Sequence, residues 1–488
     1  MSDQQLLLLA VFLPFAGAIG MLLCGRWPNL RESITLLTAA AVCSIVFTLY
    51  NHLSDGAQIA VNIAEPLPGL VIGFDVEPLG MLFALVASVL WLITSIYSIG
   101  YMREHHEQNQ TRFYAMFAIA IGCTLGVAFA GNLLSLFLWY EILTIATYPL
   151  VAHAGTDEAR RGARTYIGIL LGTSIGLQLL AILITYTVTG TLDFREGGIL
   201  AGKLDPAWAG LLFALFIFGI GKAAVMPFHR WLPAAMVAPT PVSALLHAVA
   251  VVKAGVFTVL KVTIYIFGTD FITRSGASDW LIWFAGGTIL LASIIAMTQD
   301  NLKLRLAYST ISQLSYIVLG ALLATHTSLL GGALHISMHA FAKITLFFAA
   351  GAILVAANKS NISEMGGLGR AMPITFTAFL VASLSIIGLP PFGGMWSKWY
   401  LGMGAVETGQ FLLLTVLLVS SLLNIVYLLP VPVRGFFGQS SDGKTYTQIK
   451  EAPVSCLFAM MLTSLACLLL FFYPDPFYAL AFDAAGGS

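Results

Sequence analysis

Charged residues are scarce in this sequence. Of its 488 residues, 9% are charged and 58% are hydrophobic, whereas a soluble domain carries roughly 25% charged residues. This scarcity excludes an ordinary soluble protein and indicates an integral membrane protein in contact with membrane lipid. The 23 basic and 23 acidic residues balance each other, which argues against a nucleic-acid partner.

Motifs for cofactors and metals are also missing. The five cysteines (Cys24, Cys43, Cys123, Cys456 and Cys467) lie in or beside apolar runs without CxxC spacing, which is typical of small core residues. The sequence has no glycine-rich phosphate loop, haem signature or dinucleotide fingerprint. We therefore expect no cofactor, no metal site and no catalytic redox centre in this chain.

Apolar segments predict about fourteen transmembrane helices, and thus an all-α integral membrane protein. Their approximate ranges are 4–24, 30–50, 79–100, 113–130, 132–152, 163–189, 207–226, 241–266, 278–298, 304–323, 327–356, 372–388, 392–430 and 452–473. We expect the 392–430 stretch to contain the second half of a helix divided at Pro390-Pro391, a turn near Thr408 and then a full span.

Basic residues alternate between the predicted loops. If the N-terminus is external, fifteen Lys and Arg residues fall in internal loops and three in external loops. This positive-inside distribution predicts a multi-pass protein of the cell inner (plasma) membrane with both termini on the external, periplasmic side. The longest external loop, 51–78, carries four acidic residues and no Lys or Arg, and we expect it to be an acidic loop in solvent.

The remaining basic residues are five lysines inside predicted spans: Lys222, Lys253, Lys261, Lys343 and Lys398. Glu141 is the one acidic residue deep in a span. Such side chains cost about 3 kcal/mol in a membrane and usually mark ion pathways or proton relays. Lys261 lies late in its span, so we expect its amine to reach outward to the interface.

Two of the lysines lie beside proline-rich interruptions. Four prolines separate Lys222 from Lys253, and a helix arriving at Lys222 is expected to break near Pro227 because proline removes a backbone donor. A second break is expected at Pro390-Pro391, and Lys398 comes just after it. The two interruptions are five spans apart, and an odd offset reverses direction across the membrane, as in transporters with inverted repeats.

A stripe of titratable residues marks the 327–356 span. His335, His339 and Lys343 recur at every fourth position, so they share one face over about 12 Å. Because imidazole can both take and give a proton, this pattern indicates a proton relay. A zinc site is less well supported, since no carboxylate or cysteine in the stripe completes it. His247 lies six residues before Lys253 and would share its face only in an irregular helix.

Several segments resemble the antiporter-like membrane subunits shared by respiratory complex I, membrane-bound hydrogenases and Mrp-type cation/proton antiporters. The resemblance is greatest to the Mrp D-type subunits and their hydrogenase relatives. The resemblance is carried by LWYEILTIATYPL (138–150), GKAAVMPFHRWLPAAMVAPTPVSALLHAVAVVKAG (221–255), KLRLAYSTISQLSYI (303–317), HISMHAFAKITLFFAAGAI (335–353) and IGLPPFGGMWSKWYL (387–401).

The resemblance implies fourteen helices with two inverted five-helix repeats, in which helices 7 and 12 are broken. It divides the chain into N-terminal helices 1–3 with the external loop (1–112), a first repeat (113–266), a second repeat (267–430) and C-terminal helix 14 (431–488). It also implies proton translocation by a buried Glu141–Lys222 pair, a central Lys253 and an exit lysine, Lys398.

Our interpretation is a proton-translocating member of a multisubunit complex, similar to the D-type subunits of Mrp-type Na⁺/H⁺ antiporters. The predicted relay continues through His247, His335, His339 and Lys343. The expected partners are other membrane subunits, H⁺ and, in a Na⁺/H⁺ antiporter, Na⁺. One alternative is a pump subunit of a redox-driven translocase, such as an NADH:quinone oxidoreductase or membrane-bound hydrogenase. A scaffold without transport is a third reading, against which the buried charges weigh.

Overall fold

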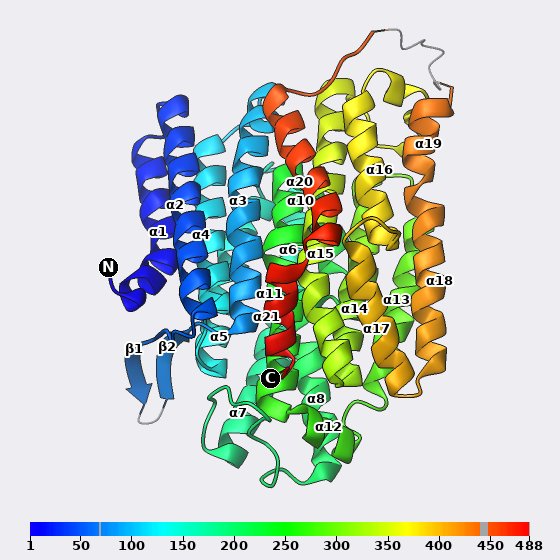
Figure 1. Ribbon diagram of the computed structural model, residues 1–488. Coiled ribbons are helices and arrows are strands. Elements are labelled where there is room, and N and C mark those ends of the chain that lie inside the picture. The colour runs from blue at the N-terminus through cyan, green and yellow to red at the C-terminus, as the bar shows by residue number, and fades with distance from the viewer. Residues whose placement is uncertain (68–69, 440–447, 488) are drawn as a thin grey trace.

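The computed structural model describes residues 1–67, 70–439 and 448–487 (Figure 1). Within these residues, twelve helices are long and apolar enough to cross a membrane, and two shorter apolar helices accompany them, Pro206–Gly219 and Pro373–Ile387. The protein is therefore a mostly helical integral membrane protein.

The helices follow the predicted apolar segments closely. The first group comprises α1 (Asp3–Leu23), α2 (Pro28–Ser54), α3 (Pro78–Glu104), α4 (Gln110–Ala128), α5 (Leu133–Val151), α6 (Asp157–Thr173), the π-helical turn η1 (Ser174–Gln178) and α7 (Leu179–Thr189). The second group comprises α8 (Pro206–Gly219), η2 (Gly221–Ala223), α9 (Trp231–Ala234), η3 (Ala235–Val237), α10 (Thr240–Ala244), η4 (Leu245–Val249), α11 (Val251–Lys261), η5 (Val262–Phe267) and α12 (Thr269–Ser275).

The remaining elements run from residue 281 onward. They are α13 (Leu281–Thr298), α14 (Leu302–Leu323), α15 (His326–Ala357), the short turns η6 (Ile362–Glu364) and η7 (Leu368–Arg370), α16 (Pro373–Ile387), α17 (Gly394–Glu407), α18 (Phe411–Leu428), α19 (Pro430–Phe437), α20 (Val454–Phe472) and α21 (Asp475–Ala484).

One part of the fold class was wrong, because the predicted acidic loop contains an antiparallel hairpin. Its strands are β1 (Ala60–Leu67) and β2 (Leu70–Asp75). The Asp75 amide donates to the Phe129 carbonyl at 2.8 Å, and the Gly73 amide donates to the Ser135 hydroxyl at 3.1 Å. The hairpin is thus fixed by the turn between α4 and α5, a contact that local sequence patterns do not reveal.

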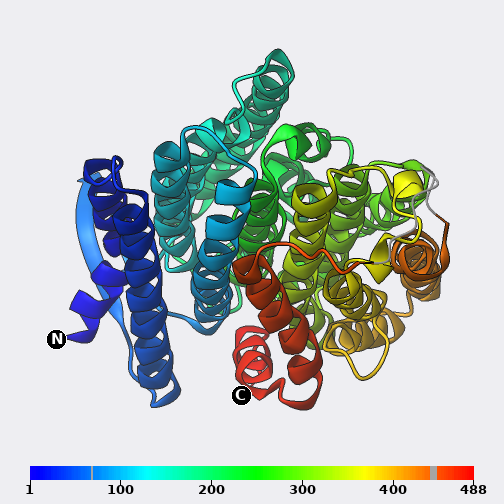
Figure 2. The same cartoon turned by 90° about the horizontal axis from the view of Figure 1, so that it is seen from above.

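The helices stand side by side, and the chain crosses the molecule from one end to the other (Figures 1 and 2). Seen from above, α1 and α2 lie at one end and α18 at the other, while α20 lies in front of α3 and α15. α20 contacts both of these helices. The C-terminal segment therefore joins the two halves of the molecule.

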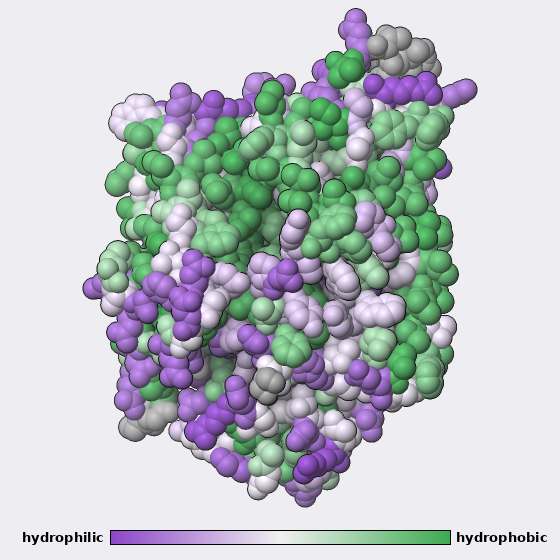
Figure 3. All heavy atoms as spheres, viewed as in Figure 1, coloured by the Kyte–Doolittle hydropathy of each residue, from purple (hydrophilic) through white to green (hydrophobic). Residues whose placement is uncertain are grey.

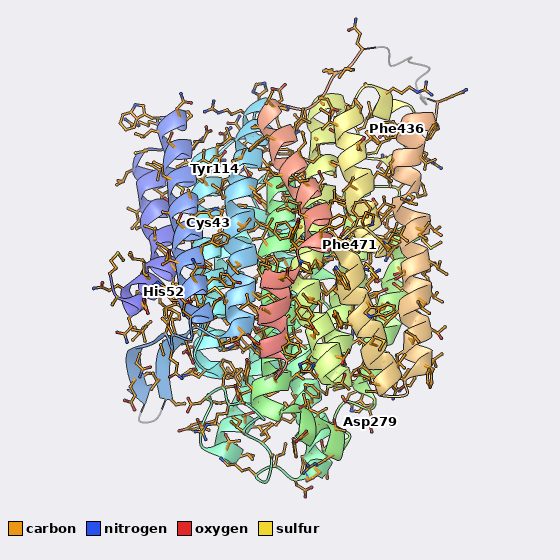
Figure 4. The ribbon with its side chains drawn as sticks, in the orientation of Figure 1. Cys43, His52, Tyr114, Asp279, Phe436 and Phe471 are labelled. Atoms are coloured by element: carbon orange, nitrogen blue, oxygen red, sulfur yellow. The ribbon has the colours of Figure 1, made fainter. Side chains whose placement is uncertain are left out.

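Hydropathy divides the surface into zones. On the face in Figure 3, hydrophobic side chains cover the upper middle and the right-hand side, whereas hydrophilic ones gather along the top edge and the lower end. In Figure 4, His52 and Asp279 lie in the lower half and Phe436 lies near the top. His52 and Asp279 therefore lie on one side of the membrane bundle and Phe436 lies on the other. The distribution of basic residues predicts the same relative placement of the three loops.

The first helix interruption lies earlier than predicted. α8 ends at Gly219, so Lys222 lies in the 3-10 turn η2 and not in a helix that continues to Pro227. Gly219 allows this early end: a Cβ there would lie 2.4 Å from the Gln178 backbone nitrogen. The Gly221 carbonyl of this turn accepts the Ala224 amide at 3.0 Å and Trp231 Nε1 at 2.9 Å, so it is satisfied, as required for a backbone group inside a membrane.

The second interruption lies where Pro390-Pro391 predicts it. α16 ends at Ile387 and α17 begins at Gly394, so six residues separate the two helices. Lys398 lies in the first part of α17. The second interruption therefore places the Lys398 amine 3.1 Å from the Ile387 carbonyl, a group that a continuous helix would have used internally.

Gly255 brings α11 against the turn that carries Lys222. A Cβ at this position would lie 2.3 Å from the Lys222 carbonyl carbon and 2.4 Å from the Ala223 nitrogen. We expect Gly255→Ala to lower the melting temperature of the detergent-extracted protein, because overpacking of a close backbone contact costs about 1–3 kcal/mol. Gly168→Ala on α6 is the control, since a Cβ there has no atom within 4 Å. Equal melting temperatures for the two variants would contradict this packing.

Candidate functional site

The Lys222 amine is fully buried between η2 and α5. Its Nζ donates to the Tyr140 carbonyl at 2.6 Å and to the Thr144 hydroxyl at 2.7 Å. It also lies 3.0 Å from the centre of the Tyr140 ring, a cation–π contact. The Tyr140 hydroxyl in turn accepts the Lys222 amide at 3.1 Å. The break in the helix and α5 thus hold this amine without an ion pair.

Glu141 lies on α5 between the two residues that bind Lys222. Both of its carboxylate oxygens are buried and have no hydrogen-bond partner among the described residues. Among those residues no ion pair within 4.0 Å joins Glu141 to Lys222. The structure therefore places the Lys222 amine, which comes from η2, against the part of α5 that carries Glu141, but with the two charged groups not in contact. Oxygens in this condition are unusual and accompany functional sites.

Lys253 connects the first half of the chain to the second. Its Nζ lies 2.8 Å from His339 Nδ1, and both side chains are buried. The helix around Lys253 is irregular, because the π-helical turn η4 (Leu245–Val249) comes immediately before α11. This turn contains His247, whose two ring nitrogens have no partner among the described residues and whose ring lies 4.7 Å from the Phe347 ring.

The stripe on α15 reaches three different helices. His335 Nδ1 lies 2.8 Å from the Ser397 hydroxyl on α17, and Lys343 Nζ donates to the Ser309 hydroxyl on α14 at 2.8 Å. His339 contacts Lys253 on α11. The rings of His335 and His339 have their centres 5.7 Å apart. The stripe is therefore buried as predicted, and α15 is the element on which its contacts converge.

Lys398 is partly buried near the second interruption. Its Nζ donates to the Ser421 hydroxyl at 2.9 Å and to the Ile387 carbonyl at 3.1 Å, a group freed by the end of α16. It also lies 5.0 Å from the centre of the Tyr316 ring, which stacks on His335. The second interruption thus positions an amine close to the His335 end of the stripe.

The prediction that Lys261 reaches outward was wrong. Its side chain is 1% exposed, and Nζ forms an ion pair with Glu77 Oε1 at 2.9 Å. The Tyr265 hydroxyl donates to Glu77 Oε2 at 2.7 Å, and Phe194 covers the amine at 4.3 Å. Burial raises the pKa of the nearby Asp75 carboxyl, and the Lys261 ammonium opposes this rise. The partner comes from a loop far away in the sequence, so no local signal could have identified it.

Several hydroxyl groups near the lysines were also missed. They are Thr144, Ser309, Ser397, Ser421 and Tyr427, and a Ser, Thr or Tyr in an apolar span carries no spacing signal of its own. In the described part of the chain, no three His, Cys, Asp or Glu side chains gather that could hold a metal ion. The arrangement consists of groups that bind and release protons, spaced along the middle of a membrane protein.

Comparisons with known proteins identify the family of this chain. Residues 130–424 match the family described as NADH:quinone oxidoreductase/Mrp antiporter, TM. The chain belongs to this family. Residues 69–114 also match the family described as NADH-Ubiquinone oxidoreductase (complex I), chain 5 N-terminus. The protein is therefore an antiporter-like membrane subunit, related to subunits of NADH:quinone oxidoreductases and of Mrp antiporters.

The relatives of this chain include subunits of quinone oxidoreductases and a subunit of a cation/proton antiporter. The chain is 33% identical over 427 residues to NADH-quinone oxidoreductase subunit N of Desulforudis audaxviator, covering 86% of this chain and 84% of that one. It is 32% identical over 416 residues to a probable A/B-type K⁺/H⁺ antiporter subunit of Rhizobium meliloti, covering 83% of this chain. It spans only 40% to 61% of the length of this and several other relatives.

A solved structure shares the fold. A chain in the structure of the Mrp complex from Dietzia sp. DQ12-45-1b matches with a TM-score of 0.87 at 22% identity, over 100% of this chain and 97% of that one. The membrane-protein fold of this family therefore extends over the whole chain.

The buried Lys261–Glu77 ion pair makes a prediction about stability. We expect Lys261→Ala to lower the free energy of unfolding by about 3 kcal/mol, because removing one partner of a buried pair leaves the other charge uncompensated. Lys203→Ala, at an amine that donates to the Thr189 carbonyl nearer the surface, is the control and should cost less than about 1 kcal/mol. Thermal unfolding in detergent measures both, and a Lys261→Ala protein as stable as the parent would show that the pair is not maintained.

Proposed function

We propose that this chain translocates protons across the cell inner membrane as part of a multisubunit, Mrp-type cation/proton antiporter, in the manner of the D-type subunits. The observation that carries the proposal is the 2.8 Å contact between Lys253 and His339. It joins the helix that follows the first interruption to the stripe of titratable residues in the second half. A buried contact between two proton-binding groups is a natural transfer point.

The proposed path begins on the internal side and reaches Lys222 beside Glu141. A change in the separation of these two side chains would alter the proton affinity of the Lys222 amine and push its proton onward. The proton then passes by Lys253 to His339 and the stripe, and leaves outward by Lys398. His247 Nδ1 and Nε2, together with Nε2 of His335 and His339, are buried and have no partner among the described residues, which favours water molecules as the bridges between them.

The proposal includes an architecture. Counted with the two interrupted helices, the spans would number fourteen, and helices 4–8 and 9–13 would form two inverted repeats within residues 113–266 and 267–430. Segments 1–112 and 431–488 would flank them. The interrupted helices α8 and α16 start at opposite ends of the molecule in Figure 1, which supports an inverted relation. α1 begins and α21 ends toward the lower side of that view, which we assign to the external side because few basic residues occur there.

A second candidate is a proton-pumping subunit of a redox-driven complex. The 33% identity to an NADH-quinone oxidoreductase subunit N, over most of both chains, favours it. In either case the partners would be other membrane subunits. Everted membrane vesicles distinguish the two: an antiporter collapses a preformed pH gradient when Na⁺ or K⁺ is added, whereas a redox pump builds the gradient when an electron donor is added.

Removal of either member of the Glu141–Lys222 pair should stop transport. We expect Glu141→Gln and Lys222→Ala each to lower the coupled pH-gradient response of everted vesicles about 100-fold or more, because a group that carries the proton is lost. Glu141→Asp keeps the charge but shortens the side chain, so intermediate activity is expected. Glu158→Gln, the same change at an exposed carboxylate on α6, is the control.

Complex abundance is measured in the same membranes. If Glu141→Gln and Lys222→Ala assemble normally and respond at the parent rate, the pair lies outside the path and the proposed function fails.

The stripe on α15 should respond as a series. If His339 and Lys343 act one after the other, Lys343→Ala alone stops transport and adding His339→Ala costs less than about threefold more, since groups in series are non-additive. Were the two only packed in the core, each truncation would lower abundance by its own increment while transport per complex stayed unchanged. The assay is therefore transport and abundance for both single variants and the double variant.

A further inference from the structure

An apolar groove lies between α16 and α20, which contact each other and stand side by side in Figure 1. Ile374 and Val381 of α16 line one wall, Phe458 and Leu465 of α20 line the other, and Phe392 of the second interruption lines it as well. Its volume is about 740 Å³, within the roughly 300–1,000 Å³ of ligand pockets. Phe458 and Leu465 are 51% and 50% exposed, so the groove opens to the outside of the bundle.

Hydrogen bonds join the two walls at both ends of the groove. At one end, the carboxylate of Glu451, which comes three residues before α20, accepts the Ile374 amide of α16 at 2.7 Å. At the other end, Trp396 Nε1 of α17 donates to the Phe471 carbonyl of α20 at 2.9 Å, and the two rings stack with their centres 5.6 Å apart. The groove between these two ties is therefore part of the fold.

The groove covers only part of the membrane thickness. From Phe458 to Leu468 a helix rises about 15 Å, whereas the hydrocarbon core is about 30 Å thick. Beyond this stretch the stack of Trp396 on Phe471 closes the groove, and Phe471 lies near mid-height of the bundle in Figure 4. A transmembrane helix of another subunit would extend through the whole core, whereas the acyl chain of a lipid occupies one leaflet. The length of the groove therefore favours an acyl chain.

A basic residue lies near the end of the groove where α16 begins. The Lys450 amide donates to the Ala371 carbonyl at 2.9 Å, two residues before α16, and the Lys450 side chain is exposed. Among the described residues no ion pair within 4.0 Å involves Lys450. Its acidic neighbour Glu451 is engaged in hydrogen bonds to α16. An ammonium at this position complements the phosphate of an anionic phospholipid.

We propose that the groove binds an anionic phospholipid, with one acyl chain between α16 and α20 and the phosphate beside Lys450. The inference goes beyond the proposed function, since it holds whether the chain belongs to an antiporter or to a redox-driven pump. The bound acyl chain contacts Phe392, so the lipid packs against the second interruption, the segment that leads to Lys398.

The test uses the full complex in nanodiscs of phosphatidylcholine that contain a small share of phosphatidylglycerol with a photoreactive diazirine in its acyl chain. After illumination, mass spectrometry identifies the labelled residues. Leu418 and Leu422 of α18, which are 60% and 62% exposed, report ordinary contact with bulk lipid. We expect Phe458 and Leu465 to be labelled about fivefold more than these two, the enrichment that one basic residue gives toward anionic lipid.

Two variants test the two parts of the site separately. Leu465→Trp fills the groove and should remove the enrichment, whereas Leu469→Trp, on the same helix, 44% exposed and outside the groove, should keep it. Lys450→Gln should lower labelling by phosphatidylglycerol about fivefold and leave labelling by a phosphatidylcholine with the same diazirine unchanged. Arg164→Gln, at an exposed arginine on α6, is the control for the loss of charge.

Groove labelling in the parent complex that is no higher than that of Leu418 and Leu422 overturns the site, because the groove then meets only bulk lipid or is covered by another subunit. This comparison needs no variant, so it decides the matter even if Leu465→Trp fails to assemble. Enrichment that survives Leu465→Trp in the assembled complex, or that is equal for phosphatidylcholine and phosphatidylglycerol, also overturns the proposal.

Discussion

The structure depends on keeping lysine amines inside an apolar membrane protein. Five lysines lie within the spans, and in the described part of the chain only Lys261 among them forms an ion pair. The other four contact hydroxyls, carbonyls, an imidazole or an aromatic ring. Neutral partners stabilise both the charged and the uncharged amine to some extent, whereas a fixed carboxylate would favour the charged one. In the proposed function, this choice of partners allows a proton to come and go.

The helix interruptions follow from the same need. A continuous α-helix uses its carbonyls internally, so it offers a buried amine few acceptors. At the second interruption the Ile387 carbonyl is free to accept Lys398, and at the first the chain turns so that Lys222 reaches α5. The π-helical turn η4 comes just before Lys253, whose side chain reaches His339 on α15. Irregular backbone therefore accompanies Lys222, Lys253 and Lys398, and is tolerated because protein surrounds it, whereas Lys343 lies within the regular helix α15.

α15 unites the two halves of the molecule. It is 32 residues long, and the three titratable side chains of its stripe, His335, His339 and Lys343, contact α17, α11 and α14. A displacement of α15 would change all three contacts together, since the side chains belong to one rigid helix. The protein can in this way link events at Lys222 to events at Lys398 without a direct contact between the two.

Local sequence patterns predicted much of this fold and part of the site. The spans were found with most ends within about four residues because each is a long apolar run between charged loops, and Pro390-Pro391 marked the second interruption. The end of α8 was misplaced because it depends on how closely Gly219 packs on Gln178, which is a tertiary contact. Lys261 was misread because its partner Glu77 comes before α3, and the hydroxyls were missed because serine in a span has no distinguishing pattern.

The most direct test of the account is proton transport by the complex with Lys253→Met, which keeps a long side chain but removes the amine that meets His339. The account predicts a complex of normal abundance whose coupled pH-gradient response in everted vesicles falls about 100-fold or more. Transport at the parent rate by the assembled variant would contradict it, because the two halves would then exchange protons without their contact.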